Sequence, residues 1–134
     1  MFQRMVPLLF VLAVLAACGP QTAVPSTPTT THQRWIAALA AHDTAAMRAE
    51  VRVAPEQMDD FLLRAIDSLK AVTFVRTRDP DALSNELGVS VWQQGTEQIC
   101  WQTELTDIDG RWYVTAFHLM PEYRPACVAA LKGE

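Results

Sequence analysis

The chain has 134 residues, half of them hydrophobic, and its 15 acidic side chains outnumber 11 lysines and arginines to give a formal net charge of −4 at pH 7. The acidic residues are spread along the chain and no basic cluster stands out, so the composition argues against nucleic acid as a partner. Once the N-terminal segment described next is set aside, the remaining length suits one compact domain and not two.

Residues 1–17 have the composition of an export signal. Arg4 is the lone charge near the N-terminus, an unbroken apolar run starts at Val6, and small residues precede Cys18. The run from Val6 to Ala17 is much shorter than the about 20 residues that a membrane-spanning helix needs. We therefore expect a signal peptide that is removed and not a permanent membrane span.

Leu15-Ala16-Ala17-Cys18 resembles the lipobox of bacterial lipoproteins. The resemblance implies cleavage before Cys18, transfer of diacylglycerol to its thiol, and further acylation by a fatty acid such as palmitate. About two acyl chains suffice for stable anchoring in a membrane. Because Gly19 follows the cysteine where inner-membrane lipoproteins have aspartate, the resemblance implies the periplasmic face of the outer membrane, or the outer face of the cell membrane where there is only one. The alternative is an ordinary cleaved signal with an incidental cysteine.

Residues 18–31 combine the predicted lipidated cysteine with a segment rich in proline and threonine and free of charge. Such a segment cannot build a hydrophobic core, so we expect an extended tether between lipid and domain. An O-glycosylated stalk is the alternative that the composition allows. The single folded domain is then predicted over residues 32–134.

Cys100 and Cys127 remain as an even pair if Cys18 carries lipid. In an exported protein we expect them to form a disulfide, with two free buried thiols as the alternative. A metal site of Cys100, Cys127 and His118 lacks the close ligand spacing of known metal motifs. The sequence therefore predicts no metal, and no motif indicates a cofactor.

The first half of the domain has helical periodicity. Thr31 is placed to cap a first helix with Trp35, Ile36, Leu39 and Ala40 on one stripe, and Asp43 to cap a second. Pro55 suits the first turn of a third helix. Its apolar residues follow the i, i+3, i+4, i+7 pattern: Met58, Phe61, Leu62, Ala65, Ile66 and Leu69.

From residue 70 the period changes to two, which predicts four strands. They cover Val72 to Val75, Leu87 to Gln93, Gln98 to Thr106, and Arg111 to Leu119. Asp109-Gly110 favours a tight hairpin, and Gln94-Gly95-Thr96 favours another turn. Asp107 to Gly110 also resembles the start of a calcium loop, but it lacks the later ligands, and the hairpin explains it. The sheet should therefore be an antiparallel meander.

The register of the last hairpin divides the side chains between two faces. A two-residue loop at Asp109-Gly110 sets Leu105 opposite Val114, Thr103 opposite Ala116, and Trp101 opposite His118. One face then has Ile99, Trp101, Thr103, Leu105, Trp112, Val114, Ala116 and His118, and the other has Cys100, Tyr113, Phe117 and Leu119. A two-residue turn at Gly95-Thr96 adds Trp92 to the first face and Val89 and Val91 to the second, whereas a three-residue loop would reverse this.

Both faces are apolar enough to need a cover. The helices should cover the tryptophan face, and the C-terminal segment 125–131 should cover the other, which would bring Cys127 to Cys100. The alternative for that second face is a homodimer interface.

Two segments resemble the nuclear transport factor 2-like family, which includes SnoaL-like cyclases. Trp35-Ile-Ala-Ala-Leu-Ala-Ala-His-Asp43 is similar to its first helix and corner, and Asp109-Gly-Arg-Trp-Tyr-Val114 is similar to its final hairpin. The resemblance implies an α+β fold in which N-terminal helices pack on a curved, cone-like four-stranded antiparallel sheet. The family includes enzymes, binders and scaffolds, so the fold alone does not give the function.

Trp92, Trp101, Thr103 and His118 are the candidate pocket residues on the tryptophan face. We expect a membrane-anchored, non-catalytic module outside the cytoplasm that binds a small apolar ligand or a partner protein. The alternative is a SnoaL-like enzyme, of isomerase, cyclase or hydratase type, that uses His118 as its base. Such an enzyme also needs a carboxylate in the pocket. Asp60 on the third helix is the nearest one that the pattern supplies.

Overall fold

The computed structural model describes residues 26–80 and 87–134. The predicted signal peptide, Cys18 and most of the predicted tether lie outside the described residues, so they remain predictions. Within the described ranges, no helix has the length and apolar character to cross a membrane.

Helix α1 spans Pro28–Ala41 and begins earlier than the sequence predicted. Thr27 and not Thr31 is its N-cap, because Thr27 and Thr30 exchange side-chain and backbone hydrogen bonds in a capping box and Pro28 follows at the first helical position. Thr31 is buried instead, and its Oγ1 donates to the Trp112 carbonyl at 3.2 Å. Residues 26–31, assigned to the tether from their composition, therefore belong to the folded part of the chain.

Three more helical segments follow a sharp corner. His42 ends α1 in the left-handed region (φ 53°), and Asp43 caps α2, Thr44–Glu50, by accepting from the Ala46 N–H at 3.1 Å. A 3₁₀ turn, η2, Pro55–Gln57, leads into α3, Met58–Ser68. The predicted Asp43 cap is confirmed, and Pro55 begins a 3₁₀ turn because it lies one turn ahead of the α-helix proper.

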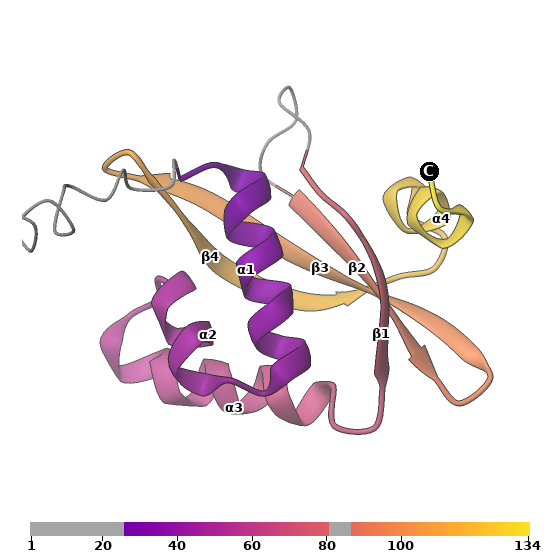
Figure 1. The fold of residues 1–134 in the computed structure, drawn as a ribbon, viewed down its shortest axis with the longest axis horizontal. Helices are drawn as coiled ribbons and strands as arrows, with labels where there is room; N and C mark the ends of the chain where they lie inside the picture. Colours follow the sequence, from indigo (N-terminus) through magenta and orange to yellow (C-terminus); the bar gives the residue numbers. More distant parts are fainter. Residues whose placement is uncertain (1–25, 81–86) are drawn as a thin grey trace, which may run out of the picture.

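The strands form one antiparallel sheet in the order β1-β2-β3-β4. Their bounds are β1 Thr73–Arg78, β2 Leu87–Gln94, β3 Glu97–Ile108 and β4 Arg111–Met120. The two-residue turn at Asp109-Gly110 is confirmed, since Ile108 pairs with Arg111. Of the two loops left open at Gly95-Thr96, the structure has the two-residue one, since Gln94 pairs with Glu97. Figure 1 shows the helices α1 to α3 gathered on one side of this meander and a last helix, α4, Pro125–Lys132, apart from them. The α+β class and the order of helices before sheet are as predicted.

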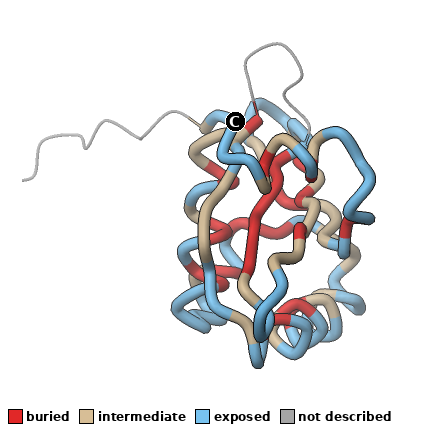
Figure 2. Tube along the Cα trace, turned by 90° about the vertical axis from the view of Figure 1, so that its right-hand side faces the viewer, coloured by how far each residue is buried: buried red, intermediate tan, exposed pale blue. Residues whose placement is uncertain are grey.

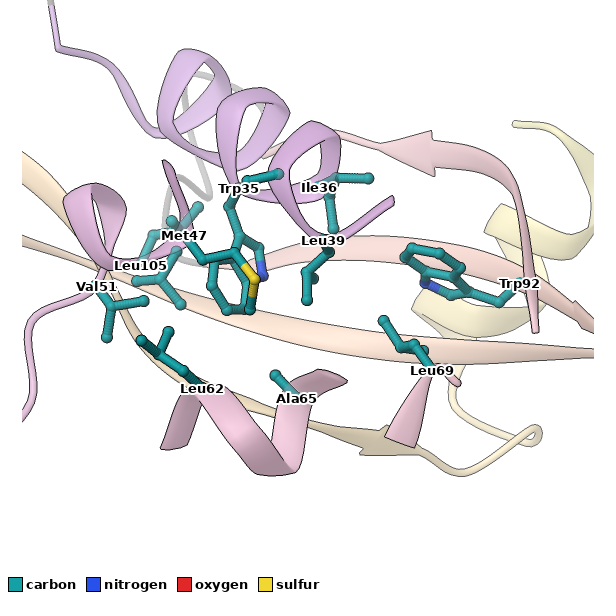
Figure 3. Packing of buried hydrophobic residues seen from close by; sticks show 12 residues of the cluster. Trp35, Ile36, Leu39, Met47, Val51, Leu62, Ala65, Leu69, Trp92 and Leu105 are labelled. Carbon is teal, nitrogen blue, oxygen red and sulfur yellow. The ribbon is translucent and has the colours of Figure 1, made fainter. Parts of the chain in front are cut away.

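The main core fills the space between the sheet and the first three helices. Buried residues run through the middle of the molecule and exposed ones lie at its periphery (Figure 2). Trp35 and Leu39 from α1 and Leu62 and Ala65 from α3 point into the same space over the strands (Figure 3). Trp35 is fully buried. The prediction that the helices cover the tryptophan face is confirmed.

A β-bulge in β4 corrects the predicted register of the last hairpin. Leu105 pairs with Val114 as predicted, but Glu104 pairs with Ala116, so Thr115 is an extra residue on β4. Beyond the bulge every side chain changes face because the period of a strand is two. Thr103 therefore pairs with Phe117 and not with Ala116, and Trp101 pairs with Leu119 and not with His118.

The opposite face of the sheet has a smaller core under α4. Val89, Val91, Cys100 and Met120 pack there against Cys127 and Ala130 of the helix. Cys100 and Cys127 are joined by a disulfide with their Cα atoms 5.8 Å apart. The predicted cover and cysteine pair are thus both present. Arg76 of β1 adds a second attachment, because its Nη1 donates to the carbonyls of Ala130 and Leu131 at the C-terminal end of α4.

Candidate functional site

An open groove of about 540 Å³ lies between α3 and two neighbouring strands, the inner strand β3 and the edge strand β4. The helical side contributes mainly polar and charged side chains together with Phe61 and Ala65, and the strands contribute aromatic and aliphatic side chains and His118. Its lining residues are Gln57, Asp60, Phe61, Arg64, Ala65, Ser68, Trp101, Phe117, His118 and Leu119.

The apolar wall of the groove is an aromatic cluster continuous with the core. Trp101 stacks on Phe117 with ring centroids 4.8 Å apart and an interplanar angle of 21°. Trp35 in turn meets Phe117 edge-on at 5.5 Å and Phe61 at 6.0 Å. These rings are therefore fixed from behind by a buried indole, and Leu119 beside them remains 57% exposed. A rigid, partly exposed apolar surface of this kind suits a ligand with apolar area to bury.

The rim of the groove has one charge of each sign. Arg64 Nη2 and Asp60 Oδ2, one helical turn apart on α3, form an ion pair at 2.5 Å, and both side chains are mainly exposed. Ser68 Oγ, at the C-terminal end of the same wall, donates to the Arg64 carbonyl at 2.7 Å. Because the two charges compensate each other, the groove attracts neither anions nor cations strongly.

The four predicted pocket residues do not converge in one cavity. Trp92 and Thr103 are buried in the core, where the Trp92 indole N–H donates to Ser90 Oγ at 2.9 Å. Trp101 is the one whose ring forms the groove wall. His118 lies at the groove's edge, but the bulge turns its imidazole to the other face of the sheet.

On that outer face His118 has polar neighbours. Its Nε2 lies 3.2 Å from Gln102 Nε2 and 3.8 Å from Glu104 Oε1, and its side chain is about half exposed. The imidazole thus points away from the aromatic wall, although the residue lies at the edge of the groove. Phe117 and Leu119 also line the groove, but the predicted register assigned them to the other face because it did not include the bulge. Nothing in the sequence pattern marks Thr115 as an extra residue.

A second polar cluster, separate from the groove, lies in the N-terminal half of α1. His32 is fully buried, and its Nδ1 lies 2.8 Å from Asp79 Oδ1, while Gln33 Nε2 donates to Asp79 Oδ2 at 3.0 Å. The His32 hydrogen bond lowers the pKa of Asp79, with partial burial opposing it. Gly88 makes room for the ring, since a Cβ there would overlap the imidazole. The His32 imidazole is therefore part of the buried interior and does not line the groove.

Metal chemistry has no site in the described part of the chain. No group of three histidine, cysteine, aspartate or glutamate side chains there could hold an ion. Cys100 and Cys127 are also unavailable as ligands because they are bonded to each other.

Comparisons with known proteins bear on the fold alone. No known protein family and no curated protein matches the chain. Among solved structures, the chain is similar to the solution structure of a SEC-C motif containing protein from Rhodopseudomonas palustris, with a TM-score of 0.53 and 17% sequence identity. The match covers 81% of this chain and 87% of that one.

This likeness corrects the family expected from the sequence. The matched protein has a different fold from the nuclear transport factor 2-like cone, so the resemblance inferred from two short segments is wrong. A helix ending in a His-Asp corner and an Asp-Gly hairpin are local structures that many folds share. None of the comparisons supports a lipoprotein family, and the anchor at Cys18 stays a prediction.

Proposed function

We propose that this domain is a non-catalytic binding module whose site is the groove between α3 and the strands β3 and β4. The observation that carries the proposal is the stacked Trp101–Phe117 pair with the exposed Leu119 beside it. Burying apolar surface contributes about 25 cal/mol per Å², which makes such a wall the favoured place for a small apolar ligand. The compensated Asp60–Arg64 pair at the rim fits a ligand with little or no net charge.

A neutral aromatic dye, N-phenyl-1-naphthylamine, tests this site directly. The dye should fluoresce on binding, and Leu119→Ser should weaken its binding several-fold by removing apolar surface from the groove. Leu63→Ser is the matched control, because Leu63 is exposed to 59% against 57% for Leu119 but does not line the groove. Equal binding by the two variants would contradict the proposed site.

A partner protein is the other occupant that the sequence suggested. The measurement that separates the two is the mass of the protein in solution with and without the dye. A monomer that binds dye at one site supports the small-ligand assignment. A homodimer that dissociates in the Leu119→Ser variant would instead make the groove an interface.

We also propose that the domain works outside the cytoplasm, attached to a membrane through lipid on Cys18. The support is the lipobox-like sequence before Cys18 together with the Cys100–Cys127 disulfide, a bond that oxidising compartments favour. Labelled fatty acid should enter the wild-type protein and not the Cys18→Ser variant. Equal labelling of the two would refute the anchor.

The alternative of an enzyme with a pocket histidine has no observation in its favour. It depended on a family that the comparisons contradict and on a register that the bulge at Thr115 changes. Asp60, the carboxylate at the groove, is paired with Arg64, and the strand register places the imidazole of His118 on the opposite face of the sheet.

A further inference from the structure

Two arginines from distant parts of the chain meet at one tyrosine ring on the edge of the sheet. Arg52 follows α2, and Arg111 begins β4. The guanidinium carbons lie 5.4 Å and 4.9 Å from the centroid of the Tyr113 ring. Both guanidinium groups therefore lie near the same ring, and both side chains are exposed.

The backbone fixes this arrangement before any ligand arrives. The Arg52 N–H donates to the Val114 carbonyl at 2.9 Å, which holds the segment after α2 alongside β4. Arg111 Nη2 donates to the Ala49 carbonyl at 3.1 Å, at the C-terminal end of α2. One donor of Arg111 is thus used, and most donors of both guanidinium groups have no partner among the described residues.

In the described part of the chain, neither arginine has a carboxylate partner. Among residues 26–80 and 87–134, the ion pairs involve Arg34, Arg48 and Arg64 but not Arg52 or Arg111. Two guanidinium groups held near each other without a carboxylate repel, and an oxyanion that contacts both would relieve that repulsion. Guanidinium groups bind carboxylate and phosphate oxygens by paired hydrogen bonds, so phosphate is one oxyanion that fits.

The cluster also lies where the chain leads towards the proposed anchor. Ser26, the first described residue, accepts from the Trp112 N–H at 2.8 Å, so the described chain starts beside Arg111 and Tyr113. Figure 1 shows the start of α1 next to the β3–β4 hairpin. Cys18 precedes Ser26 by so few residues that even a fully extended chain reaches no more than about 30 Å. A lipid on Cys18 therefore keeps this end of the domain close to the membrane surface.

We propose that Arg52 and Arg111, held by Tyr113, bind the phosphate groups of anionic phospholipids and so orient the domain on its membrane. The assignment of the phosphate to a lipid rests on the proposed anchor at Cys18. The chain as a whole is acidic, with a net charge of −4, so an anionic surface repels most of the molecule. The arginine pair then determines which end approaches the membrane.

The test uses the full chain with Cys18→Ser, so that no lipid contributes to binding. Its sedimentation with vesicles of phosphatidylcholine alone is compared with vesicles that also contain phosphatidylglycerol. The preference for the anionic vesicles should fall roughly fivefold for Arg52→Gln and further for Arg52→Gln/Arg111→Gln, and it should disappear in high salt. Arg78→Gln, an exposed arginine on the opposite edge strand β1, is the matched control and should retain the preference.

Further arms keep the result interpretable. All chains share residues 1–25, so any vesicle affinity of that segment cancels in the comparison. Arg52→Lys should restore the preference because it keeps the charge, and Arg52→Gln alone leaves the Arg111–Ala49 hydrogen bond in place. Equal preference in Arg52→Gln/Arg111→Gln and Arg78→Gln would overturn the proposal.

Two remaining outcomes separate the source of the phosphate from the anchor. Arginine-dependent binding of inorganic phosphate without preference for anionic vesicles would overturn the assignment to lipid. Fatty-acid labelling of the wild type tests Cys18 independently, so a chain that is not labelled but prefers anionic vesicles would refute the anchor and leave the arginine site standing.

Discussion

Gly88 illustrates how a single missing side chain makes a buried polar contact possible. The imidazole of His32 occupies the space that a Cβ at Gly88 would need. We expect Gly88→Ala to destabilise the fold by about 1 to 3 kcal/mol, as overpacking in a core does. Urea unfolding measures this, and in a His32→Ala background the same substitution should cost much less. An equal cost in both backgrounds would show that the ring is not the obstacle.

Asp79 should make the stability of the domain sensitive to acid. Its pKa lies below the ordinary value of 3.8, chiefly because of the His32 hydrogen bond. A carboxylate with a lowered folded-state pKa stabilises the fold above its ordinary pKa, and this contribution is lost as the pH falls through the lowered value. The free energy of unfolding should therefore fall more steeply below about pH 4 in the parent than in Asp79→Asn. Parallel profiles would contradict the assignment.

Within β4, Thr115 decides which side chains form the groove. The bulge moves Phe117 and Leu119 to the helical face and His118 away from it. The alternation of side chains in the sequence could not reveal this, because an extra residue leaves the pattern before and after it intact. Thr115 Oγ1, which lies 2.9 Å from Thr106 Oγ1, shows that the extra residue has its own partner across the hairpin.

Deleting Thr115 should therefore leave Phe117 on the helical face. The deletion would give β4 regular alternation with Phe117 still opposite Thr103, so it should cost much less than the about 3 kcal/mol or more expected for Phe117→Ala, which removes the aromatic packing. Thr115→Ala keeps the bulge and should also cost little. Thermal unfolding followed by circular dichroism compares the three variants, and a deletion as damaging as Phe117→Ala would mean that Thr115 is not the extra residue.

The disulfide is the covalent part of the attachment of helix α4 to the outer face, beside its packing and the Arg76 hydrogen bonds. The bond joins residues 27 apart in sequence, and the chain-entropy estimate for a loop of that size is about 3 to 4 kcal/mol. Cys127→Ser should lower the free energy of unfolding by this order and make α4 accessible to protease. Dithiothreitol should lower the parent to the level of the variant and leave the variant unchanged. A loss in the variant under reducing conditions would point to packing instead.

At the scale of the whole molecule, the sequence predicted the helices and strands but not the fold family. The helical stripe from Met58 to Leu69 and the Asp109-Gly110 hairpin were predicted because each depends on neighbours in sequence. The family was inferred from two such local segments, and many architectures contain them. What distinguishes one α+β fold from another is how the layers meet, which depends on contacts between residues far apart in the sequence.

The groove was missed for the same reason. Its two walls come from α3 and from the strands β3 and β4, and no periodicity within either segment says that they enclose a space. Trp101 was the one candidate whose ring contributes to the aromatic wall. Its face was predicted correctly because the extra residue lies in β4 and leaves the alternation of β3 unchanged.

The binding role of the groove is tested most directly by mapping the neutral dye N-phenyl-1-naphthylamine on the protein by two-dimensional NMR. The account predicts the largest shifts at the Trp101 indole and at the amides of Phe117, Leu119 and Ala65, with little change at Tyr113 or around α4. Shifts that are scattered over the surface, or concentrated away from α3, would contradict it.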